Sequence, residues 1–389
     1  MKNKKTFLIV TLISILSVSI LSGCVENDNK KEEKVNISLI KIADQTDMTI
    51  KHQMLVNGKP FIIKGVGYNP VPIRDNPNTK KKDYFTTEYA YIYNRDLPIL
   101  RAMGANTIRL WGWDNSDDHT DFLKKAYNNG KDPIYVIVSF WIDPDTNVSS
   151  PEVRKDLKRD FRDMVSRNKD NNAILMWSIG NELNARLKHK LDDLFSLIDE
   201  MAKEAHLEEG NNSRPVTTTL IDWNTTDTIK AYDSNMTNLD AWGVQLYRGK
   251  TFGNFLKVYP NVSSKPVIIM EFGIDAYDNV DQAENQGMQA KYVRSLWGEI
   301  EENSNITIGG LLTTYSDGWW KSGTRMDCPD KSPSIQGDCG SPMKNFPDGF
   351  ANDEWWGIVR IKENGNSPDI VEPRDVYYTM KELWTNKKN

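Results

Sequence analysis

The sequence predicts a (β/α)8 TIM barrel, preceded by a short β-hairpin and followed, after strand eight, by a long loop. Eight short apolar runs recur along the chain, and amphipathic stretches separate several of them. Runs that are apolar almost throughout are typical of parallel strands buried on both faces. Eight such units match this barrel in size and order. The runs are FIIKGVGY (61–68), NTIRLWG (106–112), IYVIVSF (134–140), AILMWSIG (173–180), PVTTTL (215–220), AWGVQLY (241–247), PVIIMEF (266–272) and IGGLLTTY (308–315).

The N-terminal segment is typical of an exported protein. Residues 1–23 begin with the basic stretch MKNKK and continue with FLIVTLISILSVSIL, an apolar run that is short for a membrane span. LSGC then places Cys24 after small residues, as in lipoprotein signals whose cysteine is lipidated. An ordinary signal peptide or anchor with an incidental cysteine is the alternative. The charged residues that follow predict a tether over 24–45.

The predicted folded domain spans 46–389 and opens with a hairpin. MLVNGKPFIIKGVGY places two apolar runs around Asn57 and Gly58, a pair that favours a tight turn between antiparallel strands.

Amphipathic stretches predict five helices. The first is expected to end at Gly104, and the second to begin at the Ser150–Pro151 pair, which favours helix entry. The last would be the eighth barrel helix. The five stretches are NRDLPILRAMGA (94–105), SPEVRKDLKRDFRDMVSRN (150–168), ARLKHKLDDLFSLIDEMAKEAHLEEG (185–210), AENQGMQAKYVRSLWGEIEENS (283–304) and RDVYYTMKELW (374–384).

The segment after the eighth run is too long for a tight loop and is predicted to fold over the barrel mouth. It contains CPDKSPSIQGDC, which favours a disulfide between Cys328 and Cys339 in an exported protein. A zinc site would need four ligands, and the 4 His of the chain are scattered, so no metal is predicted.

Composition excludes some functions and favours others. A net charge of −5 provides no basic field for nucleic acid. The 12 Trp and 15 Tyr can fill a core, and they also suit carbohydrate, because the apolar faces of sugars stack on aromatic rings.

Two carboxylates are expected at one barrel mouth. In this fold, reactive groups lie at the C-terminal ends of the strands. The fourth run ends at Asn181 and Glu182, and the seventh reaches Glu271, on the other side of the mouth. Two carboxyl groups facing one substrate, one protonated and one ionised, are the requirement of glycoside hydrolysis.

Neighbouring strand ends supply partners for these carboxylates. Arg109 is expected at the end of the second strand and would hold a nearby carboxylate ionised. Tyr247 ends the sixth run and would donate a hydrogen bond to the same carboxylate. Taken singly, a Glu at a strand end is often part of a helix cap or the partner of a surface Lys, and Arg109 would be an ordinary ion-pair partner. Their joint placement at one end of a barrel favours the catalytic interpretation.

The motifs resemble those of the retaining glycoside hydrolases of clan A. WSIGNE resembles their acid/base signature, and VIIMEFG resembles their nucleophile segment. LVNGKPFIIKGVGYNP and GANTIRLWGWDN resemble the first two strands of the β-galactosidase and β-glucuronidase family and of the fungal β-1,3-glucanosyltransferases. The latter also share the EWWGIV segment and the DNS..H run, here Asp114, Asn115, Ser116 and His119. The resemblance covers residues 54–385.

Carried over residue by residue, the resemblance implies specific roles. Glu182 would be the general acid/base and Glu271 the nucleophile of a covalent glycosyl-enzyme. Asn181 would bind the sugar hydroxyl beside the anomeric carbon, while Arg109 and Tyr247 would orient Glu271. These groups and water suffice for the reaction, so no cofactor is expected.

The sugar platform is the point at which the sequence departs from the family. Many relatives present a Trp at the end of strand eight, whereas Tyr315 stands here and Trp319 and Trp320 follow. Trp319 and Trp111 are the first choices for stacking on sugar, although any single Trp is more typical of packing. The tryptophans in or after the predicted strand ends are Trp111, Trp113, Trp141, Trp223, Trp319, Trp320, Trp355 and Trp356, and the acidic residues that would bind hydroxyls or cap loops are Asp114, Asp222 and Asp317.

The resemblance therefore implies an extracytoplasmic retaining β-glycoside hydrolase, lipid-anchored at Cys24 or secreted, that acts on an oligo- or polysaccharide. Two alternatives remain open. The same two Glu residues would serve a β-glucan transglycosylase, and a non-catalytic carbohydrate-binding lipoprotein would need neither.

Overall fold

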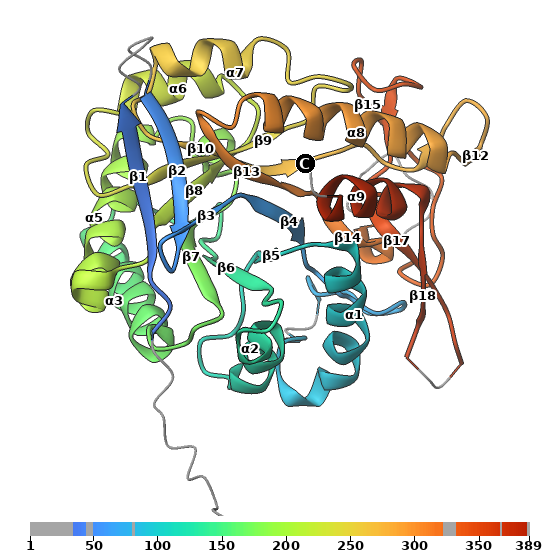
Figure 1. The fold of residues 1–389 in the computed structure, drawn as a ribbon, viewed down its shortest axis with the longest axis horizontal. Coiled ribbons are helices and arrows are strands. Elements are labelled where there is room, and N and C mark those ends of the chain that lie inside the picture. Colours follow the sequence, from blue (N-terminus) through green and yellow to red (C-terminus); the bar gives the residue numbers. More distant parts are fainter. Residues whose placement is uncertain (1–33, 44–49, 80–81, 322–331, 366–367, 387–389) are drawn as a thin grey trace, which may run out of the picture. The chain divides into compact units, whose positions relative to one another are not determined.

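The computed structural model describes residues 34–43, 50–79, 82–321, 332–365 and 368–386, and the folded unit begins at Lys34. Eight parallel strands form a closed barrel, which confirms the predicted fold (Figure 1). Each strand lies within one of the eight predicted apolar runs or extends one residue beyond it. The strands are β4 (Ile63–Gly67), β5 (Thr107–Leu110), β6 (Tyr135–Phe140), β7 (Ile174–Ile179), β8 (Val216–Leu220), β9 (Ala241–Leu246), β10 (Val267–Phe272) and β13 (Thr307–Leu312).

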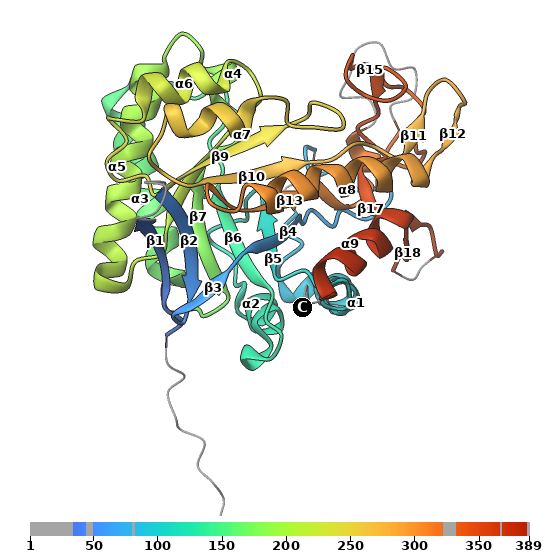
Figure 2. The same cartoon turned by 45° about the horizontal axis from the view of Figure 1, so that its top comes forward.

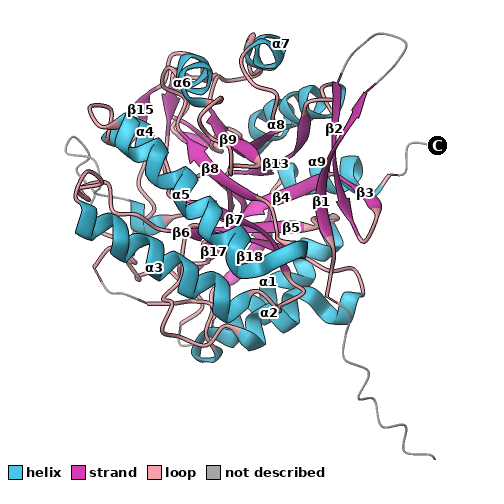
Figure 3. Cartoon of the chain, turned by 90° about the vertical axis from the view of Figure 1, so that its left-hand side faces the viewer, coloured by secondary structure: helices cyan, strands magenta, loops and turns pink. Residues whose placement is uncertain are grey.

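Helices surround the barrel, and Figure 3 shows α3 and α5 side by side on its outside. Within the described residues, no helix is both long and apolar enough to cross a membrane. The helices are α1 (Ala90–Met103), α2 (Thr120–Tyr127), α3 (Pro151–Asn168), α4 (Leu183–Arg186), α5 (Leu191–Glu209), α6 (Thr225–Tyr232), α7 (Phe255–Val258), α8 (Gln286–Glu302) and α9 (Asp375–Thr385).

Two predicted helix ends are confirmed and one is wrong. Gly104 ends α1 in the left-handed conformation, with φ of 88°, and the hydroxyl of Ser150 accepts a hydrogen bond from the Val153 amide at the start of α3. The helix predicted over 185–210 begins instead at Leu191. Acidic residues in a first turn complement the helix dipole, and basic residues oppose it. Asp192 follows the observed start, whereas the stretch before it is basic.

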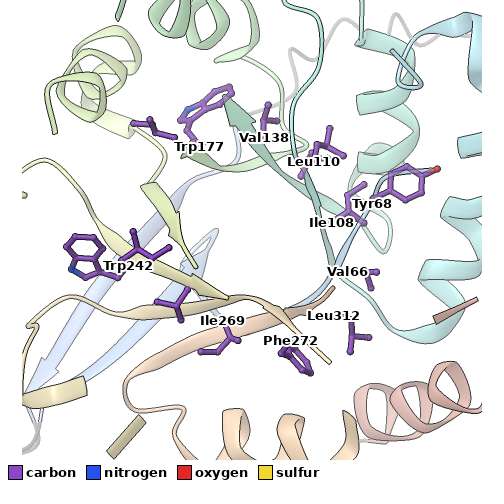
Figure 4. Packing of buried hydrophobic residues seen from close by; sticks show 14 of the residues in the cluster. Val66, Tyr68, Ile108, Leu110, Val138, Trp177, Trp242, Ile269, Phe272 and Leu312 are labelled. Carbon is purple, nitrogen blue, oxygen red and sulfur yellow. The ribbon is translucent and has the colours of Figure 1, made fainter. Parts of the chain in front are cut away.

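The side chains of the barrel strands alternate between two cores. Figure 4 shows part of the outer core, which lies between the barrel and the helices and includes Ile108, Leu110 and Ile269. The inner core fills the barrel and includes Ile63 and Ile268. Successive residues of a strand point to opposite faces. Arg109, between two outer-core residues, therefore points into the barrel.

An antiparallel sheet packs against the inner core at the N-terminal end of the barrel strands (Figure 2). It consists of β1 (Ile37–Ala43), β2 (Ile50–Val56) and β3 (Lys59–Phe61). Asn57 and Gly58 both have positive φ, of 51° and 72°, so the predicted hairpin is confirmed. The predicted tether is wrong over its last part, because β1 pairs with β2 and buries Ile37 against the barrel. The rest of the predicted tether and Cys24 lie outside the described residues.

The segment after β13 adds strands beside α9. β14 (Thr314–Ser316), β17 (Gly357–Lys362) and β18 (Ile370–Pro373) form one sheet, and β15 (Ser341–Pro342) pairs with β16 (Phe350–Ala351). A further pair, β11 (Tyr277–Asp278) and β12 (Ala283–Glu284), follows β10. The Trp356 ring packs edge-on against Tyr247, with ring centroids 4.9 Å apart, so this segment reaches the mouth as predicted. Cys328 lies outside the described residues, and its disulfide with Cys339 stays a prediction.

A buried ion pair joins the two ends of this segment and links it to β12. The Arg374 guanidinium donates to both carboxylate oxygens of Asp317, at 2.6 and 2.7 Å, and to Glu284 at 2.6 Å. Both side chains of the Arg374–Asp317 pair are fully buried. The sequence had suggested that Asp317 would bind a sugar hydroxyl or cap a loop. Because both of its oxygens are bound by Arg374, it is not available to a sugar.

We expect Arg374→Met to lower the free energy of unfolding by about 3–5 kcal/mol, because it leaves the Asp317 carboxylate buried without its cation. Urea unfolding followed by circular dichroism measures the change. The control is Arg159→Met on α3, which removes a solvent-exposed ion pair and should leave the unfolding midpoint almost unchanged. Equal midpoints for Arg374→Met and the wild type would contradict this account.

Candidate active site

The predicted catalytic residues meet at the mouth, defined here as the C-terminal ends of the barrel strands. Glu271 reaches it through an irregularity in β10. The pairing of β10 with β9 shifts register between Ile269 and Glu271. Met270 belongs to the inner core and Phe272 to the outer core. Two successive residues, Met270 and Glu271, thus face the interior, as at a β-bulge.

Glu271 is surrounded by hydrogen-bond donors. Its Oε1 accepts from Arg109 at 2.5 Å, from Gln245 at 2.6 Å and from Trp111 at 3.2 Å. Its Oε2 accepts from the Tyr247 hydroxyl at 2.6 Å. The side chain is almost completely buried, yet four donors face it, and donors stabilise the ionised form of a carboxyl group.

Gln245 is a site residue that the sequence analysis missed. Its amide nitrogen donates to Glu271 and, at 3.0 Å, to the Asn181 side-chain oxygen, which also accepts from Arg109 at 2.6 Å. Because both neighbours are donors, the atom that faces them must be the Asn181 side-chain oxygen. The NH2 group of Asn181 therefore faces away from Arg109. Gln245 lies two residues before Tyr247 on one strand, and this period-two spacing is the signal that would have found it.

Trp111 reaches Glu271 because a glycine lies beneath it. A Cβ added at Gly67 would lie 2.6 Å from the Trp111 ring and 2.1 Å from the Thr313 carbonyl oxygen. No side chain fits in that space. The absence of a side chain at Gly67 lets the Trp111 indole pack against β4, where its nitrogen reaches the Glu271 carboxylate. The Arg109 guanidinium lies over the same indole, 5.1 Å from the ring centroid.

Glu182 differs from Glu271 in its backbone conformation and in its hydrogen bonds. Its backbone is in the left-handed region, with φ of 55°, and its amide donates to the Thr219 carbonyl at 2.9 Å. It precedes α4 but does not cap it, and within the described residues its carboxyl group makes no hydrogen bond. Burial, and then the negative charge of Glu271, raise the pKa of Glu182 to about 7, although Arg109 opposes the shift.

The mouth therefore holds two carboxyl groups in different surroundings. Glu271 accepts four hydrogen bonds from its neighbours, whereas burial and the charge of Glu271 raise the pKa of Glu182 to about 7. Such a pair can donate a proton at one point of a substrate and present a nucleophile at another.

The tryptophans predicted as sugar platforms differ in their neighbours. Trp320 packs beside the cluster of Val71, Tyr84 and Ile92, and the Trp319 indole nitrogen is buried with no hydrogen-bond partner among the described residues. Tyr315 is fully buried, and its hydroxyl donates to Asp96 on α1 at 3.2 Å. Of the first two choices for stacking on sugar, Trp111 donates a hydrogen bond to Glu271, and the role of Trp319 stays a prediction.

The remaining candidates have structural partners. Both Asp222 oxygens accept from Arg248 at 2.7 Å, and Asp114 accepts from Ser116. The His119 ring stacks on Trp113 at 4.0 Å and pairs with Asp83. Among the described residues, no group of three or more His, Cys, Asp and Glu side chains is arranged to hold a metal ion.

We expect Glu271→Gln to lower the pKa of Glu182 below its value of about 7, because the substitution removes a negative charge that favours the protonated form. Burial persists, so the pKa should stay above the ordinary value for Glu, about 4.3. Carbon-13 NMR of labelled glutamate carboxyl groups measures both values. As a control, Glu152→Gln on the exposed face of α3 should not move the resonance, and a pKa unchanged by Glu271→Gln would show that the two groups do not interact.

Sequence comparisons connect the chain to two enzyme groups. A family model described as glucanosyltransferase matches residues 36–204, and one described as the TIM barrel domain of glycosyl hydrolases family 2 matches residues 129–306. The β-glucuronidase of Rattus norvegicus is 22% identical over 72% of this chain and 42% of its own length. The 1,3-β-glucanosyltransferase GAS5 of Saccharomyces cerevisiae is 34% identical over 82 residues, 21% of this chain and 15% of its own length. The chain thus spans less than half of these curated relatives.

Solved structures show the same fold. A Bacteroides uniformis β-glucuronidase has a TM-score of 0.57 and 17% identity, covering 89% of this chain and 40% of that protein. A Saccharomyces cerevisiae Gas2p mutant in complex with laminaritetraose and laminaripentaose has a TM-score of 0.58 and 15% identity, covering 91% of this chain and 68% of that protein. The two family models and these folds confirm the resemblance to TIM-barrel glycoside hydrolases of clan A that the motifs indicated.

Proposed function

We propose that this protein is a retaining β-glycoside hydrolase that acts on an extracellular oligo- or polysaccharide. The observation that carries the proposal is the contrast between the two carboxyl groups of the mouth. Glu271 accepts four hydrogen bonds, whereas Glu182 has a pKa raised to about 7. Relatives named as β-glucuronidases and glucanosyltransferases support a β-linked glycan as substrate.

The first step would form a bond between Glu271 and the anomeric carbon. As Oε2 or Oε1 of Glu271 attacks, the glycosidic C–O bond breaks, and its electron pair goes to the leaving oxygen. Glu182 gives that oxygen its proton, so the leaving group departs as a neutral alcohol. Arg109, Gln245, Trp111 and Tyr247 hold the carboxylate in place for attack.

The second step would reverse these roles. Glu182, now ionised, takes a proton from water, whose oxygen attacks the anomeric carbon from the side the leaving group vacated. The bond to Glu271 breaks, and its electrons return to the carboxylate. The two displacements together retain the configuration of the sugar.

Transglycosylation is the second candidate, because a sugar hydroxyl can replace water in the second step. The match of residues 36–204 to the glucanosyltransferase model favours it. A non-catalytic solute receptor is less well supported. It would have two lobes joined by a hinge, whereas the described residues form one closed barrel.

The N-terminal segment 1–23, which is typical of an exported protein, supports action outside the cytoplasm. The proposed membrane anchor is a lipid on Cys24. Cys24 and Cys328 both lie outside the described residues. Mass spectrometry of the protein from membranes, before and after treatment with a reducing agent, distinguishes the lipid and the disulfide by their masses.

We expect a 2-fluoro β-glycoside with a good leaving group to label Glu271. The fluorine slows both steps, and the good leaving group speeds only the first, so the glycosyl-enzyme accumulates. Glu271→Gln should abolish both labelling and turnover. Glu182→Gln should slow hydrolysis of a poor leaving group by about 100- to 10,000-fold, and that of a dinitrophenyl glycoside far less, since dinitrophenolate leaves without a proton. Peptide mapping and initial rates provide the measurements, with exposed Glu152→Gln as the control. Full activity in both site variants would refute the assignment.

We expect Gln245→Leu to lower kcat by about 10- to 100-fold, the effect of losing hydrogen bonds to a charged group. The substitution should lower kcat and leave the free energy of unfolding little changed, because Gln245 sets the positions of Glu271 and Asn181. Gln289→Leu is the matched control: Gln289 is equally buried but donates only to backbone carbonyls, of Ile274 and Gly357. If the two variants lose the same fraction of kcat, Gln245 has no specific positioning role.

A further inference from the structure

We propose that Trp141 and Trp223 form a platform for the sugars on the leaving-group side of the scissile bond. The bond attacked would then join two sugars, and the same platform would hold a sugar acceptor in the second step. This inference rests on the proposed function and narrows it to glycans with a sugar leaving group, with transfer competing against hydrolysis.

Exposure distinguishes these two tryptophans from others in the chain. Trp141 is 50% exposed and Trp223 is 43% exposed, whereas Trp177, Trp242 and Trp297 are fully buried. Single exposed apolar residues are ordinary on a protein surface. Two exposed indoles on loops at the same end of one barrel are a binding surface in a protein whose substrate has apolar ring faces.

Their backbones are fixed to the loop that carries Glu182. Trp141 directly follows β6, whose last residue, Phe140, accepts a hydrogen bond from the Gly180 amide at 2.9 Å. On the other side, the Trp223 carbonyl accepts from the side chain of Asn184 at 3.5 Å, and that side chain also bonds both backbone groups of Ile221. The two tryptophans thus lie on either side of β7, Trp141 in the loop after β6 and Trp223 in the loop after β8.

The chemistry of the first step explains why this flank is the leaving-group side. Glu182 must lie beside the glycosidic oxygen to protonate it, so the departing group extends over the strand end that carries Glu182. Glu271 lies across the mouth and takes the other sugar. Whatever departs therefore passes between the loops that carry Trp141 and Trp223.

The separation of the loops indicates the size of the leaving group. Adjacent strands lie about 4.8 Å apart, so strands β6 and β8, on either side of β7, lie about 10 Å apart. Two indoles on loops with that spacing suit a leaving group of more than one ring. A sugar held there after the first step would also be placed to attack the glycosyl-enzyme in competition with water.

The test measures how the glycosyl-enzyme partitions between water and an added sugar. The donor is a nitrophenyl β-glycoside that the wild type turns over, and the acceptors are β-1,3- and β-1,4-linked gluco-oligosaccharides. Mass spectrometry gives the ratio of transfer product to free sugar at each acceptor concentration. Because both products come from one intermediate, the ratio does not depend on the fraction of folded enzyme.

We expect Trp141→Ala and Trp223→Ala each to raise the acceptor concentration for half-maximal transfer about tenfold, as for the loss of one aromatic anchor. The double variant should require a still higher concentration. Tyr378→Ala is the matched control, because Tyr378 is an aromatic residue, 58% exposed, on outer helix α9. It should give the wild-type ratio at every concentration.

The possible failures are distinguishable. If the wild type forms the covalent intermediate but its partition ratio is unchanged in both tryptophan variants, or no acceptor gives transfer, the platform is refuted and the proposed hydrolase stands. If the wild type hydrolyses no nitrophenyl β-glycoside and is not labelled at Glu271, the proposed function itself fails.

Discussion

The buried charge of Arg109 is the constraint on which the rest of the mouth depends. Its side chain is fully buried in the barrel, where an unpaired guanidinium would cost several kcal/mol. Glu271 on β10 compensates its charge, and Asn181, just after β7, accepts a hydrogen bond from its other terminal nitrogen. A closed barrel brings these strand ends together at one opening, so the requirement for charge compensation fixes a carboxylate, an amide and the surrounding donors in one arrangement. The second carboxyl group then titrates in the field of the first.

Much of this arrangement could be predicted from sequence, because it depends on local patterns. Parallel strands buried on both faces leave uninterrupted apolar runs, and all eight were found. Polar residues in the second half of such runs or just after them, among them Arg109, Glu182 and Glu271, stand out against them. Gln245 was missed because only Tyr247, the last residue of its run, was taken from that strand. The bulge at Met270 and Glu271 leaves no mark in the sequence, since it arises from register between strands.

Other errors had tertiary causes. The segment that includes β1 is charged and was taken for a tether, but ISLIKIA buries alternate residues once β2 supplies a pairing edge. Tyr315 is at the end of strand eight in the chain, yet it is fully buried and its hydroxyl donates to Asp96 on α1, so it is not available to stack on a sugar. Proximity in sequence to a strand end does not determine which way a long loop turns.

The left-handed backbone of Glu182 has a consequence for how this chain can evolve. A side chain other than Gly, Asn or Asp in that conformation costs about 1 kcal/mol or more. The carboxyl group of Glu182 is partly buried and has no hydrogen-bond partner among the described residues, which adds to the cost. The fold would therefore be more stable with Asn or Gly at position 182. Selection for stability alone would remove this glutamate, so its presence in a strained, desolvated position is a sign of selection for what it does.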